Sequence, residues 1–208
     1  MTAHAPRRRL SRIIHGSPAV ISSTRQIPQL LPRELYEAHL TGLFTSRPET
    51  IRLFASLTMA RTHPGVATRA DAAENLGLPA DLGRRCAAAA ASSQTASPMA
   101  VLSAVSAAAR DLDRRDYRAP EGRVRALASS DAWFSTRARR YRPRTRTTTQ
   151  PLALQWLWTH VAHAHPGTAP EASPTRARRF ATTLTAEQQQ ALRQVLDEPT
   201  PPRNPETS

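Results

Sequence analysis

The fold class is decided by residues 68–93, which read TRADAAENLGLPADLGRRCAAAAASS. Alanine, the strongest helix former, recurs through this stretch, and Gly-Leu-Pro interrupts it near the middle. Thr68 and Asp71 predict a helix start, because their side-chain oxygens can accept hydrogen bonds from free amides of the first turn. No sustained alternation of apolar and polar residues, the signal of a strand, appears elsewhere in the chain. We therefore expect an all-α protein built around a small multi-helix domain.

The same stretch predicts a helix-turn-helix-like pair. Such a pair needs small residues where the two helices approach, a glycine at the turn and apolar residues that lock the helices together. The residues that meet these needs are Ala72, Ala73, Gly77, Leu76, Leu78 and Leu82. The second helix would then present Arg84 and Arg85 to a DNA groove. Gly83 occupies a position that is usually bulky and apolar, so a tight helical hairpin inside a core is the alternative interpretation.

Further helices are predicted on both sides of this pair. Ser46-Arg47-Pro48-Glu49 is typical of a capping box, and it precedes a stretch with Ile51, Phe54 and Leu57 on one helical face. Other expected elements are a helix that begins at Pro98, a helix over 152–164 and a last helix capped by Thr185 with Gln188.

Positive charge is concentrated in two short segments. The 208 residues include 29 basic side chains, all of them arginine, against 16 acidic ones, for a net charge of +13. Residues 1–25 hold five arginines and residues 137–146 hold six, with no acid in either segment. Arginine offers a planar fork that matches phosphate oxygens, so these segments favour contact with nucleic acid. A solvated segment in a proteome with GC-rich codon bias is the competing explanation.

From these observations we expect DNA to be a partner. The expected DNA-binding residues are Arg7, Arg8, Arg9, Arg12, Arg84, Arg85, Arg137, Arg139, Arg140, Arg142, Arg144 and Arg146.

Proline and charge also suggest the domain boundaries. We expect a disordered basic arm over 1–25, a helical domain over 26–165 with a basic loop at 136–149, and a linker over 166–184. An appended helix over 185–197 and a disordered tail over 198–208 complete this organisation.

Several classes of protein are disfavoured. No apolar run reaches the roughly 20 residues that a membrane-spanning helix needs, and the start of the chain lacks the apolar region of a signal peptide, so we expect a cytoplasmic protein. The single cysteine, Cys86, excludes a disulfide scaffold, and its alanine-rich surroundings favour a small buried side chain over a nucleophile. His160, His163 and His165 are more typical of a helix end than of a metal site. Enzyme motifs are missing, so we expect no catalysis and no cofactor.

Five segments occur in an order that resembles the C-terminal helical region of actinobacterial TniQ-like proteins, a family of transposition accessory proteins. They are RQIPQLLPRELYEAHL (25–40), RLFASLTMA (52–60), AAENLGLP (72–79), Asp-Tyr-Arg (116–118) and LALQWLWTHV (152–161), and together they cover roughly residues 24–165. The resemblance implies a non-catalytic role in recognising DNA or a targeting complex, with an AAA+ transposition regulator and a transposase as partners. The zinc-binding cysteine and histidine pairs that family members carry upstream have no counterpart here. The chain would be either a short standalone form or a remnant of a mobile element.

Two functional hypotheses follow. The first is a DNA-associated accessory protein in transposition or target selection. The alternative is an adaptor whose arginines dock an acidic protein partner, since complementary charge steers protein association as well.

Overall fold

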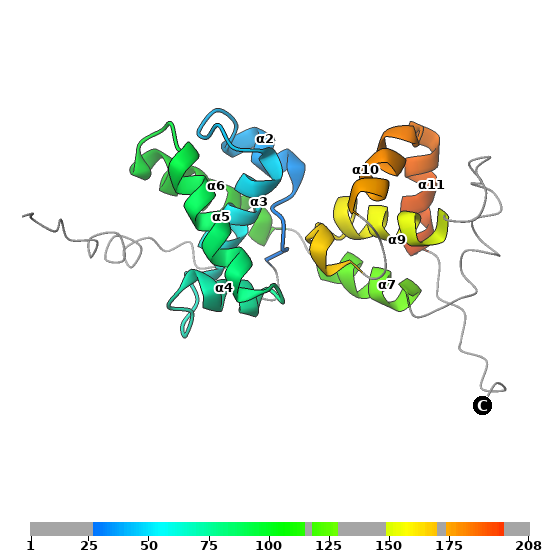
Figure 1. Ribbon diagram of the computed structural model, residues 1–208, viewed down its shortest axis with the longest axis horizontal. Coiled ribbons are helices and arrows are strands. Elements are labelled where there is room, and N and C mark those ends of the chain that lie inside the picture. Colours follow the sequence, from blue (N-terminus) through cyan, green and yellow to red (C-terminus); the bar gives the residue numbers. More distant parts are fainter. Residues whose placement is uncertain (1–26, 115–117, 129–148, 170–173, 198–208) are drawn as a thin grey trace, which may run out of the picture. The chain divides into compact units, whose positions relative to one another are not determined.

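A computed structural model of the chain describes residues 27–114, 118–128, 149–169 and 174–197. Within these ranges the protein is helical without any strand, and one isolated antiparallel bridge joins Phe44 to Gln94 (Figure 1). The all-α prediction is confirmed. The chain divides into two compact units. Among the described residues, unit 1 comprises residues 27 and 33–114, and unit 2 comprises residues 28–32, 118–128, 149–169 and 174–197.

Unit 1 is organised around one buried helix. Its elements are α2 (Arg33–His39), α3 (Pro48–Ala60), α4 (Arg69–Asn75), α5 (Ala80–Ser93) and α6 (Pro98–Asp113). Helix α3 contacts each of the other four, and every residue from Leu53 to Ala60 is buried. The sequence favours this arrangement because apolar and small side chains surround the whole second half of α3, and a helix of that kind must be covered on all sides.

Capping chemistry sets two of the predicted helix starts in unit 1. Thr68 and Asp71 form the expected capping box at α4, with the Asp71 amide 3.1 Å from the Thr68 hydroxyl and the Thr68 amide 2.8 Å from the Asp71 carboxylate. Ser97 caps α6 by accepting a hydrogen bond from the Ala100 amide, and Pro98 occupies the first helical position as expected.

The capping box predicted at Ser46 is wrong. Helix α3 begins at Pro48 with Arg47 as its N-cap, and no side chain caps it. Ser46 lies one residue too early to reach the amides of the first turn, and its hydroxyl donates instead to the Ala89 carbonyl of α5 at 3.4 Å. The serine therefore ties α5 to the loop before α3.

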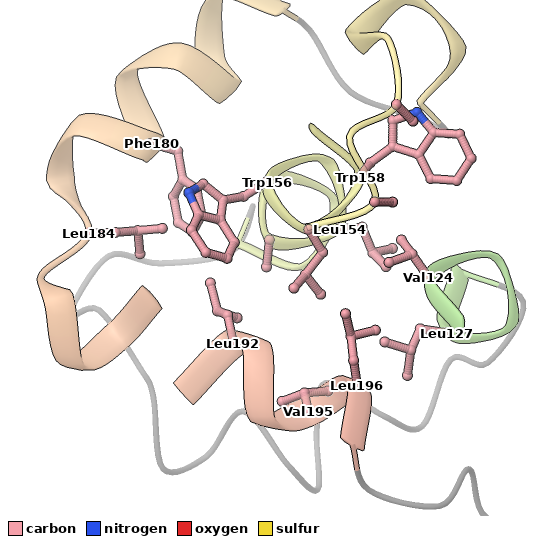
Figure 2. Packing of buried hydrophobic residues seen from close by; sticks show 14 residues of the cluster. Val124, Leu127, Leu154, Trp156, Trp158, Phe180, Leu184, Leu192, Val195 and Leu196 are labelled. Atoms are coloured by element: carbon pink, nitrogen blue, oxygen red, sulfur yellow. The ribbon is translucent and has the colours of Figure 1, made fainter. Parts of the chain in front are cut away.

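Unit 2 is organised around a second buried helix. Its elements are α7 (Arg118–Ala128), α9 (Thr149–His160), the 3-10 helix η4 (Pro166–Thr168), α10 (Pro174–Thr183) and α11 (Ala186–Asp197). Helix α9 contacts the other four, and Ala153 to Trp158 are consecutively buried. Figure 2 shows side chains of α7, α10 and α11 converging on Trp156, Trp158 and Leu154. No described helix of the chain is long and apolar enough to cross a membrane.

The predicted boundaries differ from those of the structure. Residues 26–165 do not form one domain, because the chain passes from unit 1 to unit 2 at residue 116. Residues 174–183 of the expected linker form α10, where Phe180 is only 9% exposed. The last helix is present and capped by Thr185 and Gln188, yet it is not an appendage, because Leu192, Val195 and Leu196 belong to the core of unit 2.

Helix α9 also ends earlier than the predicted helix over 152–164. It ends at His160, and His163 then adopts a positive φ of 51°. Beyond the end of the helix, the Ala164 amide donates a hydrogen bond to the Trp158 carbonyl at 2.9 Å.

A short segment, residues 28–32, lies in sequence between Ile27 and Arg33 of unit 1 but belongs to unit 2. The Gln29 side-chain carbonyl accepts hydrogen bonds from the His165 amide and from the Thr168 hydroxyl, each at 2.8 Å. The Leu30 amide donates to the His163 carbonyl at 2.7 Å, and Leu30 and Leu31 are both fully buried. Residues 28–32 therefore act as a strap on the segment that follows α9.

Candidate nucleic-acid interface

Two packed helices form over the stretch for which a helix-turn-helix-like pair or a tight helical hairpin was expected. Helices α4 and α5 pack against each other and are joined by residues 76–79, with Gly77 at a φ of 71°. Glycine adopts this left-handed conformation without steric cost, which suits it to a tight turn. Leu76 and Leu78 are 3% and 4% exposed, and the Leu78 amide donates to the Ala73 carbonyl at 2.8 Å. Helix α3 packs on both α4 and α5, so the three helices form one cluster.

Gly83 explains how closely α4 and α5 approach. A Cβ atom at this position would lie 2.2 Å from the Arg69 carbonyl oxygen and 3.0 Å from the Ala73 Cβ. In a helix-turn-helix, the position of Gly83 is usually occupied by a bulky apolar residue. In this chain the absence of a side chain at Gly83 lets the backbones of α4 and α5 come together, so the glycine is part of the packing.

One face of α5 is directed away from the core. Its exposed residues, called here the α5 outer face, are Asp81, Arg84, Arg85, Ala88, Ala91 and Ser92. They recur at the three- and four-residue spacing of one helical face, whereas Gly83, Cys86 and Ala90 are buried on the opposite side. Beyond the two arginines and Asp81, this face carries only alanine and serine side chains. A helix with such a face can approach another surface closely.

The two predicted arginines of α5 differ in their surroundings. The Arg85 guanidinium lies 2.8 Å from the Asp81 carboxylate, in a pair whose side chains are 72% and 55% exposed. Such an exposed pair contributes little to stability, so it can exchange for another anion. Arg84 is exposed and has no ion pair among the residues that the structure describes. Both residues therefore lie on one accessible face of α5.

Arg69, at the start of α4, has a structural role and does not belong to the α5 outer face. Its guanidinium carbon lies 4.7 Å from the centroid of the Phe54 ring, and its Nη1 lies 3.5 Å from the Thr58 hydroxyl. Burial lowers the pKa of Arg69. These contacts hold the start of α4 against α3.

The other predicted DNA-binding residues fall outside the described ranges. They are Arg7, Arg8, Arg9, Arg12, Arg137, Arg139, Arg140, Arg142, Arg144 and Arg146.

Unit 2 has exposed arginines that are not among the predicted DNA-binding residues. They are Arg123 and Arg125 of α7, Arg176, Arg178 and Arg179 of α10, and Arg193 of α11. The arginines of α10 lie within residues 166–184, for which the composition predicts a linker. The signal was present in the spacing of Ala177, Phe180, Ala181 and Leu184, which is that of one apolar helical face.

The histidines and the cysteine have packing roles. The His160 ring stacks on Trp156 with centroids 5.3 Å apart, and His165 Nδ1 accepts a hydrogen bond from the Gly167 amide at 3.1 Å. Burial lowers the pKa of His165 and raises that of Cys86 to about 11. Across the described ranges, no group of three or more His, Cys, Asp and Glu side chains is placed to hold a metal ion.

Comparison with known proteins finds no relative. No protein-family model, no curated protein and no solved structure matches this chain.

Proposed function

We propose that this chain is a non-catalytic protein that binds duplex DNA through α4 and α5, with the α5 outer face directed into a groove. The observation that carries the proposal is that face itself. The α5 outer face places Arg84 and Arg85 beside a row of small side chains on α5, the second helix of the α4–α5 pair.

The chemistry of the α5 outer face suits this role. Arginine can donate two parallel hydrogen bonds to guanine in the major groove or to a phosphate. Ala88 and Ala91 would let the helix axis lie near the base edges, because neither side chain extends beyond Cβ. Arg85 would exchange its pair with Asp81 for a phosphate, and Arg84 would have no pair to give up.

The resemblance to TniQ extends the proposal to transposition. In that role the protein would recognise a DNA target and help recruit an AAA+ regulator and a transposase. It predicts that the gene for this chain lies beside genes for those two proteins. Neighbouring genes of unrelated function in every available genome would argue against the transposition role and leave DNA binding untouched.

A charge-reversal experiment tests DNA binding by α5. Ala88→Glu places a carboxylate in the middle of the α5 outer face at a position where glutamate suits a helix. Ser103→Glu is the matched control, since Ser103 is an exposed residue in the interior of α6. Fluorescence anisotropy with a labelled random-sequence duplex at low salt should show an affinity at least about tenfold weaker for Ala88→Glu, equivalent to about 1.4 kcal/mol.

The control variant should bind like the wild type, and far-UV circular dichroism should show that both variants fold. Equal affinities of Ala88→Glu and wild type would refute the assignment to α5. A wild-type chain that binds no duplex at low salt would refute DNA binding altogether.

A further inference from the structure

We propose that α10 carries a second DNA-binding surface, which contacts the phosphate backbone of duplex DNA independently of base sequence. This surface, called here the α10 arginine face, consists of Arg176, Arg178 and Arg179. The inference rests on the proposed function, since it assigns a second contact to the same ligand.

Charge balance distinguishes the two units. Among the described residues, unit 1 has nine arginines and eight acids, whereas unit 2 has seven arginines and three acids. In unit 1 several arginines are neutralised locally, as in the pairs Arg33–Glu37 at 2.7 Å and Arg85–Asp81 at 2.8 Å. Positive charge on unit 1 is thus largely balanced, and the excess among the described residues lies on unit 2.

Five of the seven described arginines of unit 2 fall into two groups. The guanidinium carbon of Arg125 lies 4.9 Å from the Trp158 ring centroid, and that of Arg193 lies 5.4 Å from the Trp156 ring centroid. These two side chains cover the tryptophans of the core. No ion pair or aromatic contact involves Arg176, Arg178 or Arg179 within the described part of the chain, so their donors are available to a ligand.

At about 100° per residue, the three arginines span about 160° of the exposed side of α10, with Arg179 between Arg178 and Arg176. Phe180 points into the core of unit 2, and Leu184, which follows α10, also belongs to that core, as Figure 2 shows. From Arg176 to Arg179 the helix rises about 4.5 Å. B-DNA carries one negative charge for about every 1.7 Å of its axis, so three guanidinium groups over this distance face a comparable density of phosphates.

The composition of the face selects the ligand class. Its exposed residues are arginine and threonine only, and it offers no apolar side chain around which a protein interface could form its core. Single-stranded nucleic acid is bound through exposed rings on which bases stack, whereas among the described residues of unit 2 the rings of Trp156, Trp158 and Phe180 are only 3%, 1% and 9% exposed. A duplex, recognised through its phosphates, remains the ligand that this surface fits.

The salt dependence of binding by the full chain tests the inference. The triple variant Arg176→Gln, Arg178→Gln and Arg179→Gln removes the charges while keeping good helix formers. The matched control removes three exposed arginines of unit 1, namely Arg33→Gln, Arg110→Gln and Arg114→Gln. Affinity for a labelled random-sequence duplex of about two helical turns is measured over a salt series. Urea denaturation followed by tryptophan fluorescence confirms that unit 2 is folded.

Each phosphate contact contributes about 0.9 to the slope of log affinity against log salt concentration. We expect the slope of the α10 variant to be less steep by about 2 to 3, and that of the control by less than about 1. An unchanged slope for the α10 variant, with weakened binding by Ala88→Glu, would overturn the second surface and leave the proposed function in place. Equal losses in the α10 variant and the control would also overturn it. So would an α10 variant that keeps its duplex affinity but loses binding to polyglutamate, which would identify an acidic protein as the ligand.

Discussion

The close approach of α4 and α5 predicts that Gly83→Ala destabilises unit 1. The new methyl group would lie 2.2 Å from the Arg69 carbonyl oxygen, whereas a carbon–oxygen contact normally measures about 3.3 Å or more. The conflict is with backbone, so no rotamer change removes it, and α4 and α5 must separate by about 1 Å. Overpacking of this kind costs about 1–3 kcal/mol.

A second effect of the substitution acts in the opposite direction. Alanine inside a helix is about 0.5–1 kcal/mol more favourable than glycine. Taking the middle of both ranges, the expected net loss is about 1 kcal/mol in the free energy of unfolding. Gly122→Ala in α7 is the control, because a Cβ there meets nothing within 4 Å. That variant should gain about 0.5–1 kcal/mol.

Urea denaturation measures both variants. Far-UV circular dichroism follows Gly83→Ala, and tryptophan fluorescence follows Gly122→Ala, because all three tryptophans lie in the sequence range of unit 2. Gly83→Ala should also weaken duplex binding, since it displaces α5 from α4. A Gly83→Ala chain as stable as the wild type, or more stable, would refute the packing argument.

Three further predictions concern single side chains. Gln29→Ala removes two hydrogen bonds that hold the strap to unit 2 and should lower the unfolding free energy by about 1–3 kcal/mol in tryptophan-detected urea curves; an unchanged midpoint would contradict the role of residues 28–32. Hydrogen bonds from Thr68, and then from Ala67, hold the pKa of Asp71 below its ordinary value of 3.8, so the stability contributed by its carboxylate is complete above that value and is lost as pH falls through the lowered pKa. Melting curves from about pH 5 downward should show a shallower acid loss for Asp71→Ala than for the wild type, and identical pH dependence would argue against the cap. Burial raises the pKa of Cys86 to about 11, so iodoacetamide near neutral pH should alkylate the native thiol far more slowly than the urea-unfolded one, and equal rates would show that the site is open.

Local chemistry made much of unit 1 predictable. The cap at Thr68, the turn at Gly77 and the alanine-rich helix that follows are each specified by neighbouring residues, and the structure has all three. Gly83 could not be interpreted in the same way. The reason for its small size is the Arg69 carbonyl, which belongs to the other helix of the pair.

Unit 2 was harder to predict because its helices depend on one another. The buried residues of α9, Ala153 to Trp158, are consecutive and include the polar Gln155, so they show no periodic apolar face by which the helix ends could be set. Helix α10 has a single large apolar side chain before its end, Phe180, among arginines and threonines that also suit a linker. The contacts of Gln29 span 136 and 139 residues, and no local pattern indicates partners so distant.

The long separation in sequence between Gln29 and its hydrogen-bond partners has a consequence for folding during synthesis. All helices of unit 1 are complete once Asp113 has been made, but the partners of Gln29 follow it by 136 and 139 residues. At ribosomal rates of about 5–20 residues per second, the strap waits on the order of ten seconds with Leu30 and Leu31 unburied. Unit 1 therefore has time to fold while the nascent chain still lacks the core of unit 2.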